Sequence, residues 1–128
     1  MATLTIGNDV DNVTIQSLVE VEVAISGLTA TLDSYRFDVT FSQGVLAALA
    51  TNPGTIDNAA GTITGIARSN VNVNFGAPLL KLYFNAIGAG TCKLSIPSPT
   101  VALLDANGNQ IPFTTKDGKV FVAAPLST

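Results

Sequence analysis

The clearest pattern in the sequence is an alternation of apolar and polar residues between positions 34 and 41. The apolar members are Tyr35, Phe37, Val39 and Phe41, and the polar members are Ser34, Arg36, Asp38 and Thr40. A period of two is typical of a strand with one face in a core and the other in water. Each large apolar side chain contributes roughly 1.5–3 kcal/mol when it is buried, so the row fixes which face points inward. A slip of one residue would expose the whole row, and the register is therefore firmly specified.

The same alternation predicts further strands along the chain. A second clear strand covers residues 19–26 and a long one covers residues 80–86, while shorter or weaker ones cover residues 4–6, 62–68, 70–75, 92–96, 101–104 and 120–122. In the strand at 62–68 we expect Ile63, Gly65 and Ala67 to point inward, and Thr64, Ile66 and Arg68 to point outward. The run at 45–50 is compatible with a short strand or a single helical turn, because Ala and Leu favour helix but the run is too short for an isolated one.

Turn-forming residues separate these stretches at short intervals. Gly, Pro, Asn and Asp gather at residues 7–9, 52–54, 57–61 and 88–90. Pro97 and Pro99 interrupt a strand, because proline lacks the N–H that a central strand needs. Asp117-Gly118 is typical of a tight hairpin that leads into the last strand. Many short strands with close turns and no long helix predict an all-β fold, an antiparallel sandwich or barrel.

Length and composition indicate a single globular domain. The chain has 128 residues, 47% of them hydrophobic and 12% charged, a balance opposite to that of disordered segments. We interpret residues 1–128 as one domain, with 1–3 as a linker or artificial leader and 123–128 as a tail. The start lacks the basic and apolar regions of a signal peptide. No apolar run approaches the roughly 18 residues of a membrane span, so we expect no membrane insertion.

The charged residues and the cysteine exclude some partners and chemistries. Six scattered Lys and Arg residues in a chain of net charge −3 form no basic stripe, and nucleic acid is not expected as a partner. The single cysteine, Cys92, forbids an internal disulfide. It alternates with Leu94 and Ile96, and we interpret it as a small hydrophobic core residue.

Catalytic chemistry has little support in the sequence. Histidine is absent, which removes the commonest general base and metal ligand. Glu20 and Glu22 share one strand face, roughly 6.5–7 Å apart by the strand rise, a spacing within the range of paired glycosidase carboxylates. A solvated outer face explains them equally well, and nothing predicts a cleft around them. We therefore expect a protein that is not an enzyme.

Calcium binding and sugar binding also have little support in the sequence. Asp105, Asn107 and Asn109 match the first half of an EF-hand loop, but Gln110 and Lys116 stand where that loop needs Gly and Glu. A turn whose side chains satisfy backbone groups is the better interpretation. Sugar binding on a sandwich uses exposed flat aromatic side chains. Tryptophan is absent, and Tyr83 alone makes a poor platform.

Several segments, in order and spacing, resemble a cohesin. They are residues 19–25, 35–41 with Val45-Leu46 and Pro53-Gly54, 105–112, and 117–120. The similarity runs from about Leu4 to Val122. Cohesins are extracellular modules that bind dockerins in cellulosomes and in related non-cellulosomal surface proteins of bacteria and archaea. The resemblance implies a nine-stranded jelly-roll sandwich, a secreted or cell-surface location, and a dockerin-containing protein as the partner. It implies no cofactor on this chain, since the calcium belongs to the dockerin, and only indirect contact with polysaccharide.

In cohesins the dockerin lies across one sheet face and touches two strands and a loop. The resemblance carries this contact to the strand at 34–41, the strand at 62–68 and the loop at 105–110. The positions implied are Ser34, Arg36, Asp38, Thr40, Thr64, Ile66, Arg68, Ser69, Gly108 and Asn109. Ser34 and Arg36 depart from the Asn and Asp of many members, which reverses a charge, and Gly108 replaces an apolar loop residue.

The outward position expected for Ile66 gives this face its energetic centre. An exposed isoleucine between Arg36 and Arg68 would form an apolar centre with a charged rim, and such centres tend to dominate interface energetics. The sequence therefore predicts a non-catalytic recognition module that binds a dockerin-type partner. A carbohydrate-binding module and a structural spacer or adhesin domain are the alternatives.

Overall fold

The computed structural model describes residues 2–7, 10–50 and 54–123. Their secondary structure is β1 (Ala2–Ile6), β2 (Val10–Val13), β3 (Leu18–Ser26), β4 (Leu32–Thr40), β5 (Leu46–Ala50), β6 (Thr55–Asp57), β7 (Thr62–Arg68), β8 (Ala77–Ala86), β9 (Gly90–Leu94), the 3-10 turn η1 (Ser98–Thr100), β10 (Ala102–Asp105), β11 (Phe113–Lys116) and β12 (Gly118–Val122). None of these described elements is a helix long and apolar enough to span a membrane.

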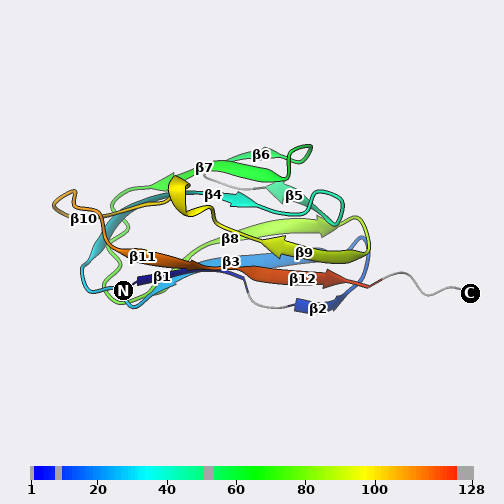
Figure 1. Cartoon of the computed structure of the whole chain (residues 1–128), viewed down its shortest axis with the longest axis horizontal. Helices are drawn as coiled ribbons and strands as arrows, with labels where there is room; N and C mark the ends of the chain where they lie inside the picture. The colour runs from blue at the N-terminus through cyan, green and yellow to red at the C-terminus, as the bar shows by residue number, and fades with distance from the viewer. Residues whose placement is uncertain (1, 8–9, 51–53, 124–128) are drawn as a thin grey trace, which may run out of the picture.

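The strands form two layers, which confirms the predicted jelly-roll sandwich. One layer is a five-stranded sheet in the order β11-β1-β3-β8-β5. The other combines the sheets β10-β4-β7-β6 and β2-β12-β9, which meet where Thr40 and Ser95 exchange backbone hydrogen bonds of 2.8 and 3.0 Å. Figure 1 shows β4, β7 and β6 along one side of the molecule and β1, β3 and β11 along the other. The paired strands are antiparallel apart from β1–β11 and β2–β12.

The core lies between the layers and contains the apolar row of β4. Tyr35, Phe37, Val39 and Phe41 are all buried, as their alternation predicts. The ring of Phe41 meets that of Phe84 from the opposite layer edge-on, with centroids 5.2 Å apart. Cys92 is also buried, as predicted, and burial raises the pKa of its thiol. No charged side chain is buried among the described residues.

Two short stretches in the middle of the chain have different outcomes. The ambiguous run at 45–50 forms a strand, β5, which pairs with β8. The strand predicted at 70–75 is reduced to a single bridge between Val73 and Leu32. Asn70 and Asn72 have φ angles of 58° and 52°, and this left-handed conformation interrupts an extended strand.

The predicted Asp-Gly hairpin does not form, because the two strands around Asp117 belong to different sheets. β11 lies parallel beside β1, and β12 lies parallel beside β2. The N-terminal strands thus pair with the C-terminal ones, and Ala2 and Thr3 belong to β1 rather than to a linker. Residues 124–128 of the predicted tail lie outside the described residues. Gly118 crosses close to β1: a Cβ atom there would lie 2.2 Å from the carbonyl oxygen of Ile6.

Replacement of Gly118 by alanine should therefore destabilise the domain. Backbone cannot yield as a flexible side chain does, so we expect Gly118→Ala to lower the free energy of unfolding by about 1–3 kcal/mol. Gly44→Ala is the matched control, because nothing lies within 4 Å of its Cβ position. Urea unfolding of both variants measures the difference. Equal stability of the two variants would show that Gly118 does not pass as close to Ile6 as described.

Candidate functional site

The outer face of β4 forms the centre of a mostly polar surface. Arg36 donates from Nη1 to the Thr100 carbonyl over 3.0 Å, and its Nη2 lies 3.7 Å from Asp38 Oδ1. The backbone N–H of Asp38 donates to Thr100 Oγ1 over 3.1 Å. The η1 turn, which follows Pro97 and contains Pro99, is therefore held against β4. Ser34, Arg36, Asp38 and Thr40 lie on one face, as predicted, and the Arg36 side chain is 51% exposed.

A β-bulge in β7 changes which of its side chains join this face. Phe37 pairs with Ile66 and Val39 pairs with Ile63, so Asp38 faces two residues, Thr64 and Gly65. Gly65 has a φ of 69°, and its N–H donates to Asp38 Oδ1 over 2.9 Å. An extra residue on one strand shifts the alternation by one position beyond it.

The predicted outward position of Ile66 is therefore wrong. Its side chain is 0% exposed and belongs to the core. The Ile66-centred contact predicted from the sequence does not exist. Thr64, which precedes the shift and pairs with Thr55, stays exposed as predicted.

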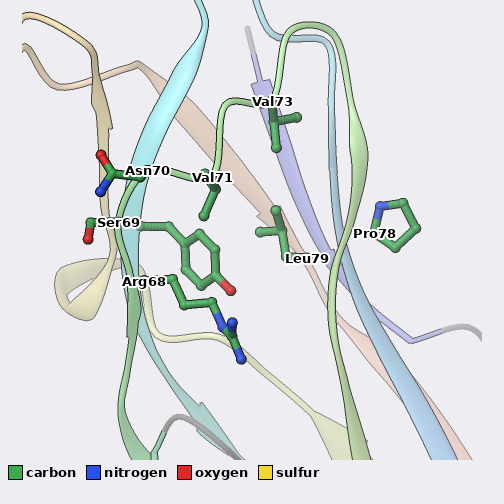
Figure 2. A pocket seen from close by; sticks show the side chains of 8 residues that line it. Arg68, Ser69, Asn70, Val71, Val73, Pro78 and Leu79 are labelled. Atoms are coloured by element: carbon green, nitrogen blue, oxygen red, sulfur yellow. The ribbon is translucent and has the colours of Figure 1, made fainter.

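Arg68 is displaced by the same shift. It pairs with Tyr35, whose side chain points into the core, while Ala67 pairs with the outward Arg36. Figure 2 shows the Arg68 side chain in a pocket beside Val71 and Leu79. Arg68 is nevertheless exposed and also lines a depression on the outer face together with Ser34 and Arg36, so it borders both surfaces.

A shallow depression occupies the part of the face where Ile66 was expected. It has a volume of about 430 Å³ and lies across β10, β4 and β7. Its outward side chains are Ser34, Arg36, Ala67, Ser69, Ala102 and Leu104. Ser69 thus lies with Ser34 and Arg36, as predicted. Sequence analysis missed the apolar members, although Gly65 inside a strand pattern is a known sign of a bulge.

The loop with Gly108 and Asn109 lies at the end of β10, beside the start of β4. Leu104 pairs with Ser34 and also bridges to Gln110, and both loop residues are exposed. The Asp105 carboxylate accepts the N–H groups of Asn107 and Asn109, each over 2.9 Å. The loop is thus a hydrogen-bonded turn, organised by the aspartate. In the described part of the chain no three His, Cys, Asp or Glu side chains are grouped to hold a metal ion.

The opposite sheet carries the carboxylates considered for catalysis. Glu20 and Glu22 are exposed on β3, as predicted. Glu20 Oε1 lies 3.0 Å from Lys81 Nζ, which raises the pKa of Lys81 through the hydrogen bond and the opposite charge. Glu20 is thus held in an exposed ion pair, and Glu22 is exposed two residues further along the same strand. Tyr83 is exposed on the same face.

Comparison with solved structures identifies the fold. The CaCohA2 domain of Clostridium acetobutylicum, solved in a complex with CaDoc0917, matches with a TM-score of 0.78 and 19% identity over 96% of this chain and 100% of that one. The third ScaC cohesin of Acetivibrio cellulolyticus, solved with the ScaB dockerin, matches with a TM-score of 0.77 and 13% identity over 97% and 100%. A non-cellulosomal cohesin of the archaeon Archaeoglobus fulgidus matches with a TM-score of 0.74 and 18% identity over 96% and 91%.

The chain thus has the fold of cohesin domains. The match covers nearly the whole of both chains in each comparison, which agrees with the extent of the sequence resemblance. No protein-family model matches the sequence, and no curated protein matches it.

Stability measurements can test the burial of Ile66. We expect Ile66→Ala to lower the free energy of unfolding by about 2–5 kcal/mol, because it empties part of the core. Thr64→Ala, two positions earlier on the exposed face, should cost less than about 1 kcal/mol. Urea unfolding compares the two. If Ile66→Ala costs no more than Thr64→Ala, the bulge does not turn Ile66 inward.

Proposed function

We propose that this domain is a non-catalytic recognition module that binds a dockerin-type partner on the outer face of the β10-β4-β7-β6 sheet. The observation that carries the proposal is the cohesin fold along nearly the whole chain, at TM-scores of 0.74–0.78. Solved relatives of this fold include complexes with dockerins. The contact residues proposed are Ser34, Arg36, Asp38, Thr40, Thr64, Ala67, Ser69, Ala102, Leu104, Gly108 and Asn109.

The rigidity of this face favours binding. Asp38 is held by Gly65, Thr100 and Arg36, and the adjacent loop is held by Asp105. A partner that docks here finds side chains already ordered. Less conformational entropy is lost on association, and more of the contact energy is expressed as affinity.

The depression replaces the isoleucine as the apolar centre of the face. Ala67, Ala102 and Leu104 supply its apolar side chains, while Ser34, Arg36 and Ser69 supply its polar rim. This arrangement suits an aliphatic side chain on the partner's helix. Arg36 favours an acidic partner residue beside that side chain, and such a charge pair governs partner choice and association rate more than total affinity.

We infer that the module works outside the cell, attached to a larger bacterial or archaeal protein, and that it contacts polysaccharide only through its partner. It needs no cofactor of its own, because the calcium in such a complex belongs to the dockerin. Glu20, the carboxylate considered for catalysis, is held in an exposed ion pair with Lys81 and gives no support to an enzymatic role.

Calorimetric titration against a panel of calcium-loaded dockerins tests the proposal. We expect at least one to bind, and Ala67→Glu to weaken that binding by about tenfold or more, because it places a charge in the apolar depression. The matched control is Ala89→Glu, an equally exposed alanine in the β8–β9 connection. Both variants should keep the wild-type melting temperature.

Three results would overturn the proposal, and each points to a different alternative. No binding across the whole panel would favour a spacer or adhesin domain. Equal weakening by Ala67→Glu and Ala89→Glu would place the docking surface elsewhere. Retention on crystalline cellulose, chitin or starch in a pull-down would favour the carbohydrate-binding alternative.

A further inference from the structure

A second pocket opens between the two layers, on the inner side of Arg68. It has a volume of about 380 Å³ and combines residues from β4, β7, the β7–β8 loop and β8. Its lining consists of Tyr35, Arg68, Ser69, Asn70, Val71, Val73, Pro78 and Leu79. Figure 2 shows Val71, Val73 and Leu79 on one side of the pocket and Arg68 on the other, with its guanidinium turned away from these three side chains. Pockets of this size commonly bind small organic groups.

The loop that walls this pocket is fixed by backbone hydrogen bonds. The N–H of Val71 donates to the Asp33 carbonyl over 2.9 Å. Val73 and Leu32 exchange a pair of backbone hydrogen bonds of 3.0 and 2.7 Å. These hydrogen bonds join the loop to β4. The apolar wall of the pocket is therefore already formed in the absence of a ligand.

The Tyr35 hydroxyl marks this pocket as a binding site. Tyr35 is 3% exposed, and its buried hydroxyl has no hydrogen-bond partner. Buried polar groups in native proteins are almost always paired, and an unpaired one calls for an explanation such as a bound group. The hydroxyl is covered in this structure, so a ligand would reach it only after a lining side chain moved, and Arg68 is the long, exposed one among the described lining residues.

The charge of the lining selects the kind of ligand. Arg68 brings a positive charge, and none of the described residues that line the pocket is acidic. Burial raises the pKa of Tyr35, and the nearby Arg68 charge lowers it by less, so the phenol keeps its proton at neutral pH and can donate. A guanidinium and a phenol O–H are both donors that suit a carboxylate, and the apolar wall suits a short aliphatic part.

We propose that this pocket binds a carboxylate group, with Arg68 and the Tyr35 hydroxyl as donors and Val71, Val73 and Leu79 against the carbon chain. The carboxylate comes either from a small organic acid or from an acidic side chain of a docked protein. The pocket adjoins the outer depression, because Tyr35, Arg68 and Ser69 line both. The proposal does not depend on the identity of the dockerin-type partner.

Titration of the domain alone with sodium acetate tests the site. Backbone amide NMR signals of Ser69, Asn70, Val71 and Leu79 should shift and saturate with acetate, but not with sodium chloride at equal ionic strength. Arg68→Gln should weaken acetate binding by about tenfold or more, since a hydrogen bond to a charged group is lost together with the charge. Tyr35→Phe should weaken it by about tenfold for the loss of the hydroxyl donor.

Two tyrosine variants, Tyr35→Phe and Tyr83→Phe, control for effects on folding. Tyr35→Phe removes a hydroxyl that has no partner, so its melting temperature should equal or exceed that of the wild type. Tyr83→Phe, on the exposed face of the other sheet, should bind acetate as the wild type does. Identical shifts with acetate and chloride, or unchanged acetate binding by Tyr35→Phe, would overturn the proposal.

Competition separates the two sources of the carboxylate. If the group belongs to a docked protein, saturating acetate should weaken dockerin binding, and Tyr35→Phe should weaken it without acetate. If it belongs to a small acid, dockerin affinity should be the same with acetate and with chloride. Either result is consistent with carboxylate binding in the pocket and identifies the source of the carboxylate. If no dockerin binds, the acetate titration still tests the pocket, because it uses the domain alone.

Discussion

The inward apolar row of β4 is the constraint on which the rest of the structure depends. β4 lies between β10 and β7, and its Tyr35 and Phe37 pair with Leu103 and Ile66, which are also buried. Burial of these side chains fixes the register of the strands on both sides. The same register turns Arg36, with its neighbours Ala67 and Ala102, outward. One row of large side chains therefore decides the composition of the core and of the proposed docking face together.

The structure agrees with the sequence where an element carries its own information. The alternation in β3 and β4 predicts their buried and exposed residues correctly, because each strand has large apolar side chains at every second position. Cys92 is predicted correctly for the same reason. Short polar segments carry less information. In the Asn70–Val73 segment, alternate valines suggested a strand, but the asparagines adopt left-handed conformations, which asparagine tolerates better than most residues.

Features that depend on distant parts of the chain could not be predicted. The bulge in β7 is held by the carboxylate of Asp38, which is far from Gly65 in the sequence. The Asp117-Gly118 pair is a strong local signal for a hairpin, yet parallel pairing of both chain ends outweighs it. The glycine there serves close passage beside Ile6 rather than a turn. In the candidate site the outward β4 residues were therefore placed correctly and Ile66 was not, while Arg68 is exposed but borders the inner pocket as well as the outer face.

The bulge has opposite effects on the two surfaces at this end of the sheet. With uninterrupted alternation, Ala67 would point into the core and Arg68 would point out beside Arg36. The extra residue exchanges them. The outer face gains a small apolar residue, Ala67, at the depression that Arg68 also borders. The inner pocket gains a guanidinium next to an unpaired phenol. The shape of the docking face and the charge of the pocket are therefore two consequences of one backbone irregularity, and a change at Gly65 that removed the bulge would alter both at once.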